Sequence, residues 1–389
     1  MSNWKSKLEN LFENVDNLSD DFRLRLKRIR NSDKPLKIVP FVGYGTSDKF
    51  RVSGRVLEDK GNIITKETDG KMQNLVNLYK RFETDEVAGA RIRAVYQNAE
   101  TEAVTDSEGY FYLEIRPTDN IPSKLFQEIE LYLLEPLLKN GQMISAVGQF
   151  LTPPETARFG VISDLDDTVL TSNVTNKVKM FLTVALLNEY TRMPFKGVAA
   201  FYKALQNGAT GSENNPIFYV SSSPWNLYPL LIEFLKIQNI PLGPLFLKDF
   251  GNHTIFSSGE HKSHKINNIE SVLNTYPHLP FILIGDSGEQ DPEIYSEIVK
   301  KYPQRIKVVY IRNIDLKPER IASIDKLINE IKDTGCQLVL APDTEFAAVH
   351  AASEKLILTD ELANIREEKK TAALAPSARE ISGEQIASL

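Results

Sequence analysis

The sequence predicts two domains, an all-β sandwich followed by an α/β domain on a doubly wound parallel sheet. From Lys37 to about residue 150, short segments of β-type alternation are separated by turn residues. After Pro153-Pro154, short apolar segments alternate instead with segments of helical spacing. A length of 389 residues, at about 150 residues per domain, leaves room for both domains.

The chain divides into four predicted parts. Residues 1–34 are expected to form an amphipathic helix, because apolar residues recur there every three to four positions among many charges. Residues 35–154 are assigned to the β-sandwich and residues 155–345 to the α/β domain. Residues 346–389 become rich in Glu, Lys, Ala and Ser, so we expect a tail that is first helical and then disordered.

The predicted strands of the first domain are short and separated by turns. Residues 105–109 (Thr-Asp-Ser-Glu-Gly) are typical of a turn that joins residues 102–104 and 110–115 in a hairpin. Further strands are predicted at residues 50–57, 90–95, 128–134 and 142–147.

In the second domain, apolar runs predict the strands of a buried parallel sheet. These strands are expected at residues 159–163, 217–220, 281–284, 306–311 and 337–340. Segments of helical spacing lie between them, at residues 197–207, 265–274 and 292–302.

The composition excludes several classes of protein. With 46 Lys and Arg against 52 Asp and Glu, the net charge is −6, so a nucleic-acid partner is not expected. The single cysteine, Cys336, excludes an internal disulfide and a cysteine-based zinc site. No apolar stretch approaches the roughly 18 residues of a membrane span, and residues 1–34 lack the apolar core of a secretory signal. We expect a cytoplasmic protein.

Polar side chains gather where the predicted parallel strands end. Residues 164–168 (Asp-Leu-Asp-Asp-Thr) follow the first strand, residues 221–224 the second, and residues 285–291 (Gly-Asp-Ser-Gly-Glu-Gln-Asp) the third. Lys265 begins a predicted helix between the last two. Because reactive groups collect at the carboxyl ends of parallel strands, carboxylates, hydroxyls and an ammonium group should meet at one edge.

This set of groups is suited to phosphoryl transfer through a carboxylate. One Asp attacks phosphorus and becomes an aspartyl phosphate, while a second carboxylate protonates the leaving oxygen and then activates water. A hard divalent cation must lower the repulsion between the two anions, and oxygen ligands favour Mg²⁺. A lysine and a hydroxyl group can orient the remaining phosphate oxygens.

The same segments, in the same order, resemble the four motifs of the haloacid dehalogenase superfamily. Residues 164–168 resemble the first motif, Ser221 the second, Lys265 the third, and Gly285-Asp286 with Asp291 the fourth.

Longer segments are similar to a narrower family, the actin-patch-type phosphatidate phosphatase catalytic family. Residues 219–225 (Tyr-Val-Ser-Ser-Ser-Pro-Trp) and residues 281–295 carry this second resemblance. Residues 43–46 and the hairpin at residues 105–111 also resemble bacterial members. The resemblance covers roughly residues 37–358.

The resemblance implies a role for each matching residue. Asp164 would be the nucleophile and Asp166 the general acid/base. Ser221 and Lys265 would bind the phosphoryl group, although Lys262, three residues earlier, competes with Lys265 for that role. A Mg²⁺ ion would be held by Asp164, Asp166, Asp286 and Asp291.

The resemblance makes phosphatidate the expected substrate, with diacylglycerol and phosphate as products. Two alternatives stay open: a phosphatase of another, soluble phosphomonoester, and a non-catalytic module that recruits partners. Residues 172–194 form a long insert with many apolar residues, led by Lys177 and Lys179. Such an insert either packs on the domain or forms a rim that contacts lipid, which would allow peripheral membrane contact.

Overall fold

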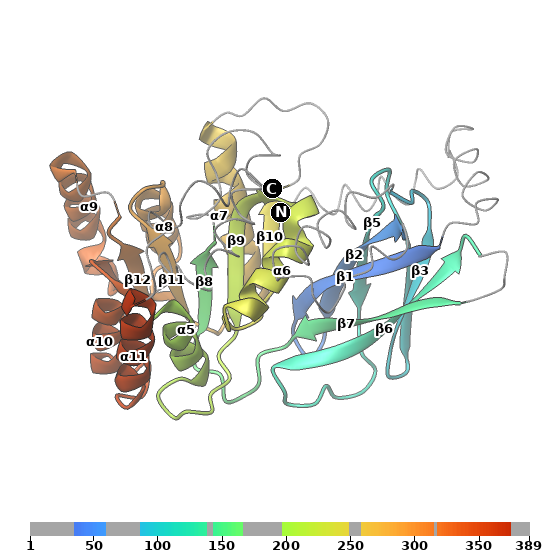
Figure 1. Ribbon diagram of the computed structural model, residues 1–389, viewed down its shortest axis with the longest axis horizontal. Helices are drawn as coiled ribbons and strands as arrows, with labels where there is room; N and C mark the ends of the chain where they lie inside the picture. The colour runs from blue at the N-terminus through green and yellow to red at the C-terminus, as the bar shows by residue number, and fades with distance from the viewer. Residues whose placement is uncertain are drawn as a thin grey trace.

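The protein consists of an all-β domain beside an α/β domain (Figure 1). The computed structural model describes residues 35–59, 86–137, 143–165, 197–248, 258–314 and 317–374. The helix predicted for residues 1–34 and the disorder predicted toward the end of the tail lie outside these ranges, as do the insert at residues 172–194 and Asp166.

The α/β domain is organised around a six-stranded sheet in which every neighbouring pair is parallel, which confirms the predicted α/β class. The strand order is β10-β9-β8-β11-β12-β13. The strands are β8 (Gly160–Asp164), β9 (Ile217–Pro224), β10 (Leu245–Lys248), β11 (Phe281–Asp286), β12 (Ile306–Arg312) and β13 (Gln337–Ala341). The sequence did not predict β10, which has only four residues and therefore a weak pattern.

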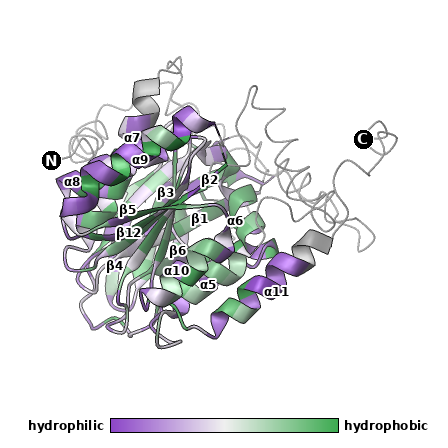
Figure 2. Cartoon of the chain, turned by 90° about the vertical axis from the view of Figure 1, so that its left-hand side faces the viewer, coloured by the Kyte–Doolittle hydropathy of each residue, from purple (hydrophilic) through white to green (hydrophobic). Residues whose placement is uncertain are grey.

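Helices cover both faces of this sheet (Figures 1 and 2). One face carries α5 (Val198–Asn207), α6 (Tyr228–Ile237), α10 (Thr344–Ser353) and α11 (Glu361–Leu374). The other carries α7 (Ser258–Thr275), α8 (Asp291–Lys301) and α9 (Pro318–Ile331), after which a 3₁₀ turn spans Lys332–Thr334. Successive strand residues alternate between the two cores, as Val161 and Ile162 of β8 do. Among the described helices, none is both long and apolar enough to cross a membrane.

The order of the strands reverses between β8 and β11. From β8 the chain moves outward through β9 to β10, and then returns to the other side of β8 to form β11, β12 and β13. Right-handed crossovers in opposite directions place their helices on opposite faces, which explains the two helical layers. Ligands of open α/β sheets bind at such a reversal, beyond the carboxyl ends of the strands.

The segment predicted as a tail from residue 346 begins with helices that pack on the α/β domain. Ala348 of α10 and Ile365 of α11 are fully buried in the core on the α5 side. Glu368 accepts a hydrogen bond from the backbone N–H of Ala200 at 2.8 Å, which supplies a partner at the first turn of α5. The helical part of this segment therefore lies against the domain.

The β domain has one hydrogen-bonded sheet where two packed sheets were predicted. All seven strands are joined in the order β4-β3-β6-β7-β1-β2-β5. They are β1 (Leu36–Gly45), β2 (Phe50–Glu58), β3 (Arg91–Tyr96), β4 (Ala99–Val104), β5 (Tyr110–Ile115), β6 (Phe126–Glu135) and β7 (Ile144–Leu151). The long strand β1 joins β4, β3, β6 and β7 on one side to β2 and β5 on the other. It pairs antiparallel with β2 and parallel with β7. The core includes Phe50 and Phe150, whose rings stack 3.7 Å apart.

An aromatic cluster of Phe41, Trp225 and Tyr228 joins the two domains. Phe41 of β1 stacks on Trp225 at 4.8 Å between ring centroids and lies 4.2 Å from the ring of Tyr228. The backbone N–H of Val42 donates to the Tyr228 hydroxyl at 2.6 Å. Trp225 begins the 3₁₀ turn Trp225–Leu227 directly after β9, so the β domain supports the chain at the end of that strand.

Candidate active site

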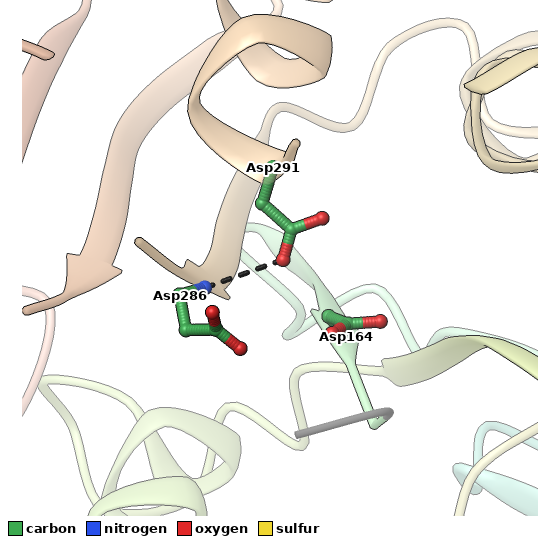
Figure 3. A group of neighbouring side chains, drawn as sticks. All are labelled: Asp164, Asp286 and Asp291. Carbon is green, nitrogen blue, oxygen red and sulfur yellow. Dashed lines mark hydrogen bonds between the residues drawn. The ribbon is translucent and has the colours of Figure 1, made fainter. Parts of the chain in front are cut away.

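Three aspartates meet at the carboxyl edge of the sheet, at the reversal between β8 and β11 (Figure 3). Asp164 ends β8, Asp286 ends β11, and Asp291 begins α8. One carboxylate oxygen from each lies within 4.8 Å of the others. Three of the four carboxylates predicted to hold a metal are therefore together, and the fourth, Asp166, lies outside the described residues.

The loop between Asp286 and Asp291 is held by its own carboxylates. The backbone N–H of Asp286 donates to Asp291 Oδ2 at 3.2 Å (Figure 3). Asp286 Oδ1 accepts the N–H groups of Gly288 at 2.6 Å and Glu289 at 3.2 Å. These bonds fix the direction of both side chains, because each bond joins a carboxylate to backbone of the same loop.

Lys265 of α7 lies among these carboxylates and is only 3% exposed. Its Nζ is 2.9 Å from Asp164 Oδ1, 2.9 Å from Asp291 Oδ1 and 2.8 Å from Glu289 Oε2. The competing lysine, Lys262, lies outside this group and pairs with Glu297 at 2.6 Å. The two side chains lie about one helical turn apart, and only Lys265 reaches the strand ends.

The site holds an excess of buried negative charge. Burial raises the pKa of Asp291 to about 6, and the charges of Glu289 and Asp286 add to that rise, whereas Lys265 opposes it. With three carboxylates and one ammonium group, the centre therefore keeps a net negative charge. All donors are oxygens, the ligands that hard divalent cations prefer, so the group fits a metal such as Mg²⁺.

Ser221 lies inside β9 at the same edge and is fully buried. It follows Val220, the residue paired in register with Asp164. Its Oγ accepts the backbone N–H of Ser223 at 3.0 Å, which shapes the turn into Pro224. Ser221 therefore lies beside the strand end that carries the predicted nucleophile.

A cavity of about 90 Å³ opens beside the aspartates, on the face of the sheet covered by α5 and α10. Asp164, Asp286 and Arg312 line its polar side. Its apolar wall includes Phe201 and Tyr202 of α5. The Tyr202 hydroxyl is 2.6 Å from Ser163 Oγ. Burial raises the pKa of Tyr202 to about 12, so this hydroxyl stays protonated.

Comparison with known proteins agrees with this arrangement. Residues 159–313 match the family model of the catalytic domain of phosphatidate phosphatase APP1. This part of the chain is similar to that catalytic domain. The matched range contains every site residue that the sequence predicted, and the resemblance to the phosphatidate phosphatase catalytic family is confirmed.

Two curated relatives match part of the chain. Phosphatidate phosphatase APP1 of Saccharomyces cerevisiae is 31% identical over 235 residues, which are 59% of this chain and 38% of that protein. An uncharacterized protein of Schizosaccharomyces pombe is 27% identical over 238 residues, again 59% of this chain and 38% of that protein. The match thus spans less than two fifths of the length of either relative.

Similarity to solved structures is weak. The Bifidobacterium dentium β-glucuronidase in complex with coumarin-3-O-glucuronide aligns with a TM-score of 0.24 at 10% identity, covering 87% of this chain and 58% of that one. A TM-score this low establishes no common fold.

Two cationic residues of the α/β domain were not identified from the sequence. Arg312 ends β12 beside the aspartates and would have been found by the rule that located them, since it too ends a parallel strand. Arg320 supports the loop after β11: its Nε donates to Ser287 O at 2.7 Å, and its Nη2 is 3.1 Å from Glu293 Oε2. No strand-end signal identifies Arg320, because it lies in a helix far along the chain.

Gly285 allows Asp291 to pack directly against the end of β11. A Cβ atom at this position would lie 2.8 Å from both Cβ and Cγ of Asp291. Asp291 belongs to the first turn of α8 and has little room to withdraw. We expect Gly285→Ala to lower the turnover of the α/β domain at least tenfold, and to cost about 1–3 kcal/mol of stability through overpacking.

Gly160→Ala is the matched control for this change. It also overpacks the sheet, against the ring of Phe281, but at the opposite edge. It should cost similar stability and leave turnover per folded molecule unchanged. Phosphate release, corrected for the folded fraction by thermal melting, makes the comparison; equal activity losses in the two variants would contradict the role assigned to Gly285.

Proposed function

We propose that this protein is a Mg²⁺-dependent phosphatase that releases phosphate from phosphatidate through an aspartyl-phosphate intermediate. The observation that carries the proposal is the cluster of Asp164, Asp286, Asp291 and Lys265 at the strand reversal of a domain related to the catalytic domain of phosphatidate phosphatase APP1. The parallel sheet with helices on both faces is also consistent with a haloacid dehalogenase-like fold.

In the proposed reaction, a carboxylate oxygen of Asp164 attacks phosphorus while the bond from phosphorus to the alcohol oxygen breaks. Asp166, two residues further along the chain, gives a proton to that oxygen, and diacylglycerol leaves. Asp166 then takes a proton from water, whose oxygen attacks the phosphorus of the aspartyl phosphate. The bond between phosphorus and Asp164 breaks, so phosphate is released and both carboxylates return to their starting states.

The other residues of the site would bind and orient the phosphoryl group. Lys265 is already 2.9 Å from the nucleophile, so it can hold a phosphate oxygen next to Asp164. Ser221 would supply a hydroxyl from the neighbouring strand. A Mg²⁺ ion held by Asp164, Asp286 and Asp291, with Asp166, would lower the repulsion between the carboxylates and the incoming phosphate.

The proposal also includes contact with a membrane, through a segment outside the described residues. Peripheral contact with a membrane would use the insert at residues 172–194, which follows the first motif and carries many apolar residues. A cytoplasmic location belongs to the same proposal.

The alternative of a non-catalytic recruiting module does not account for a buried lysine placed between three carboxylates.

A phosphate-release assay with and without metal tests this function. We expect phosphate from phosphatidate vesicles in the presence of Mg²⁺, no release after treatment with EDTA, and recovery when Mg²⁺ is restored. In the absence of substrate, Mg²⁺ should also raise the melting temperature. At a metal concentration a hundred times the dissociation constant, binding should raise the free energy of unfolding by up to about 3 kcal/mol. Asp286→Asn should remove this shift, because it takes away one carboxylate ligand.

The substrate arms of the assay separate the remaining possibilities. Release from glycerol 3-phosphate and other soluble phosphomonoesters but not from lipid would favour the soluble-substrate alternative. No release from either class with Mg²⁺ present, or full activity after exhaustive chelation, would refute the proposal.

A further inference from the structure

Arg312 places a second positive charge at the edge that carries the aspartates. It ends β12 and is paired in register with Asp286, the last residue of β11. Its backbone carbonyl accepts the N–H of Ser287 at 2.9 Å, which ties the end of β12 to the loop after β11. The position of the Arg312 backbone relative to Asp286 is therefore fixed by the sheet.

The Arg312 side chain lies on the opposite face of the sheet from Lys265. Tyr310, two residues earlier, belongs to the core on the α5 side, and alternation along a strand gives Arg312 the same face. Arg312 accordingly lines the cavity beside Asp164 and Asp286. Lys265 comes instead from α7, which covers the other face. The two cations thus reach the strand ends from opposite sides.

The charges around the cavity favour Arg312 as an anion ligand. The pKa of Arg312 is lowered by burial and raised by the negative charge of Asp164, and an arginine remains protonated under both influences. Asp343 also lines the cavity; its Oδ1 accepts the N–H of Phe346 at 2.9 Å and its Oδ2 pairs with Lys369 at 2.7 Å.

Lys265 alone is poorly suited to neutralise a phosphate dianion. Its ammonium group lies within 3 Å of three carboxylate oxygens, so its charge is already shared between them. Even with Mg²⁺ at the aspartates, a dianion entering among carboxylates would be stabilised by positive charge on the side that Lys265 does not reach. The cavity of about 90 Å³ is large enough to admit the free oxygens of a phosphoryl group.

We propose that Arg312 binds the phosphate group of the substrate from the cavity side, opposite Lys265. The ligand class is a phosphate monoester dianion, and the inference rests on the phosphatase function proposed above. The planar guanidinium group can donate two parallel hydrogen bonds to phosphate oxygens, which would orient phosphorus toward Asp164.

The experiment measures phosphate affinity separately from turnover. Inorganic phosphate, a product of the proposed reaction, is titrated calorimetrically into the full chain in the presence of Mg²⁺. Arg312→Met should weaken its binding by roughly 10- to 100-fold, the loss expected for charge-assisted hydrogen bonds. Arg312→Lys, which keeps the charge but not the planar fork, should fall between Arg312→Met and the wild type.

Arg305→Met is the matched control, since Arg305 lies just before the amino end of the same strand. Its Nη2 donates to the carbonyls of Leu273, Tyr276 and Leu279, far from the aspartates. This variant should melt at a lower temperature and keep the phosphate affinity of the wild type. If Arg312→Met does not fold, Arg312→Gln is measured by the same criterion.

Hydrolysis of glycerol 3-phosphate and of a dissolved short-chain phosphatidate completes the test. If Arg312 binds the phosphate group, its loss raises KM for both substrates by similar factors. A loss confined to the lipid, or wild-type phosphate affinity in Arg312→Met, would overturn the inference. Failure of the wild type to hydrolyse any phosphomonoester would instead reject the proposed function, while the phosphate titration still reports on Arg312.

Discussion

Asp164→Asn is expected to abolish phosphate release while the protein stays folded. The amide cannot form the acyl phosphate, and removal of a catalytic nucleophile costs up to about 10⁶ in kcat. The fold should survive because Lys265 keeps two anionic partners, Asp291 and Glu289. Single-turnover phosphate release, with far-UV circular dichroism as the folding measurement, provides the check.

Asp343→Asn is the matched control for the nucleophile. Asp343 lines the same cavity, but its carboxylate caps α10 and pairs with Lys369 at the surface. Asparagine is also a good helix cap, so the change should cost less than about 1 kcal/mol and leave turnover near that of the wild type. More than a tenth of wild-type turnover in Asp164→Asn would exclude Asp164 as the nucleophile.

Lys265→Met should combine a large loss of turnover with a loss of stability. Removal of a preorganised cation typically lowers kcat by about 10²–10³. The same change leaves the buried side chains of Asp164 and Asp291 without their ammonium partner, and breaking a buried ion pair costs about 3–5 kcal/mol. Urea denaturation of the metal-free protein measures this second effect.

Lys262→Met removes the other lysine of the third-motif region. Lys262 pairs with Glu297 at the surface, so its loss should change stability by no more than about 1 kcal/mol and leave turnover intact. The reverse result, with a silent Lys265→Met and an inactive Lys262→Met, would transfer the phosphate-binding role to Lys262.

Much of the site could be predicted from sequence because its residues follow short apolar strands directly. Asp164 and Asp286 end β8 and β11, so the strand pattern alone places them at one edge. The choice between Lys262 and Lys265 needed the structure, since they lie on neighbouring turns of α7 and local spacing does not say which of them reaches the strand ends. Glu289 illustrates another limit: its contact with Lys265 depends on how α7 packs on the sheet.

The β domain shows why prediction of single strands does not give their order and pairing in a sheet. Each predicted strand of that domain overlaps an observed one, and the segment 110–115 coincides with β5. The arrangement depends on pairings between distant residues, such as Gly43 with Phe150, which local alternation does not encode. The packing of helix α11 on the α/β domain also depends on distant residues and could not be predicted from local sequence. Its charged sequence indicates a solvated tail, yet Ile365 is fully buried.

The aromatic contact between the domains bears on how modular the protein is. Cut free at residue 154, the α/β unit would expose Trp225 and Tyr228 to water, and the Tyr228 hydroxyl would lose the backbone group it now meets. These residues directly follow the strand that carries Ser221. The smallest autonomous unit is therefore larger than residues 159–313, the segment that matches the family model. The β domain completes the outer surface of the strand end on which the chemistry depends.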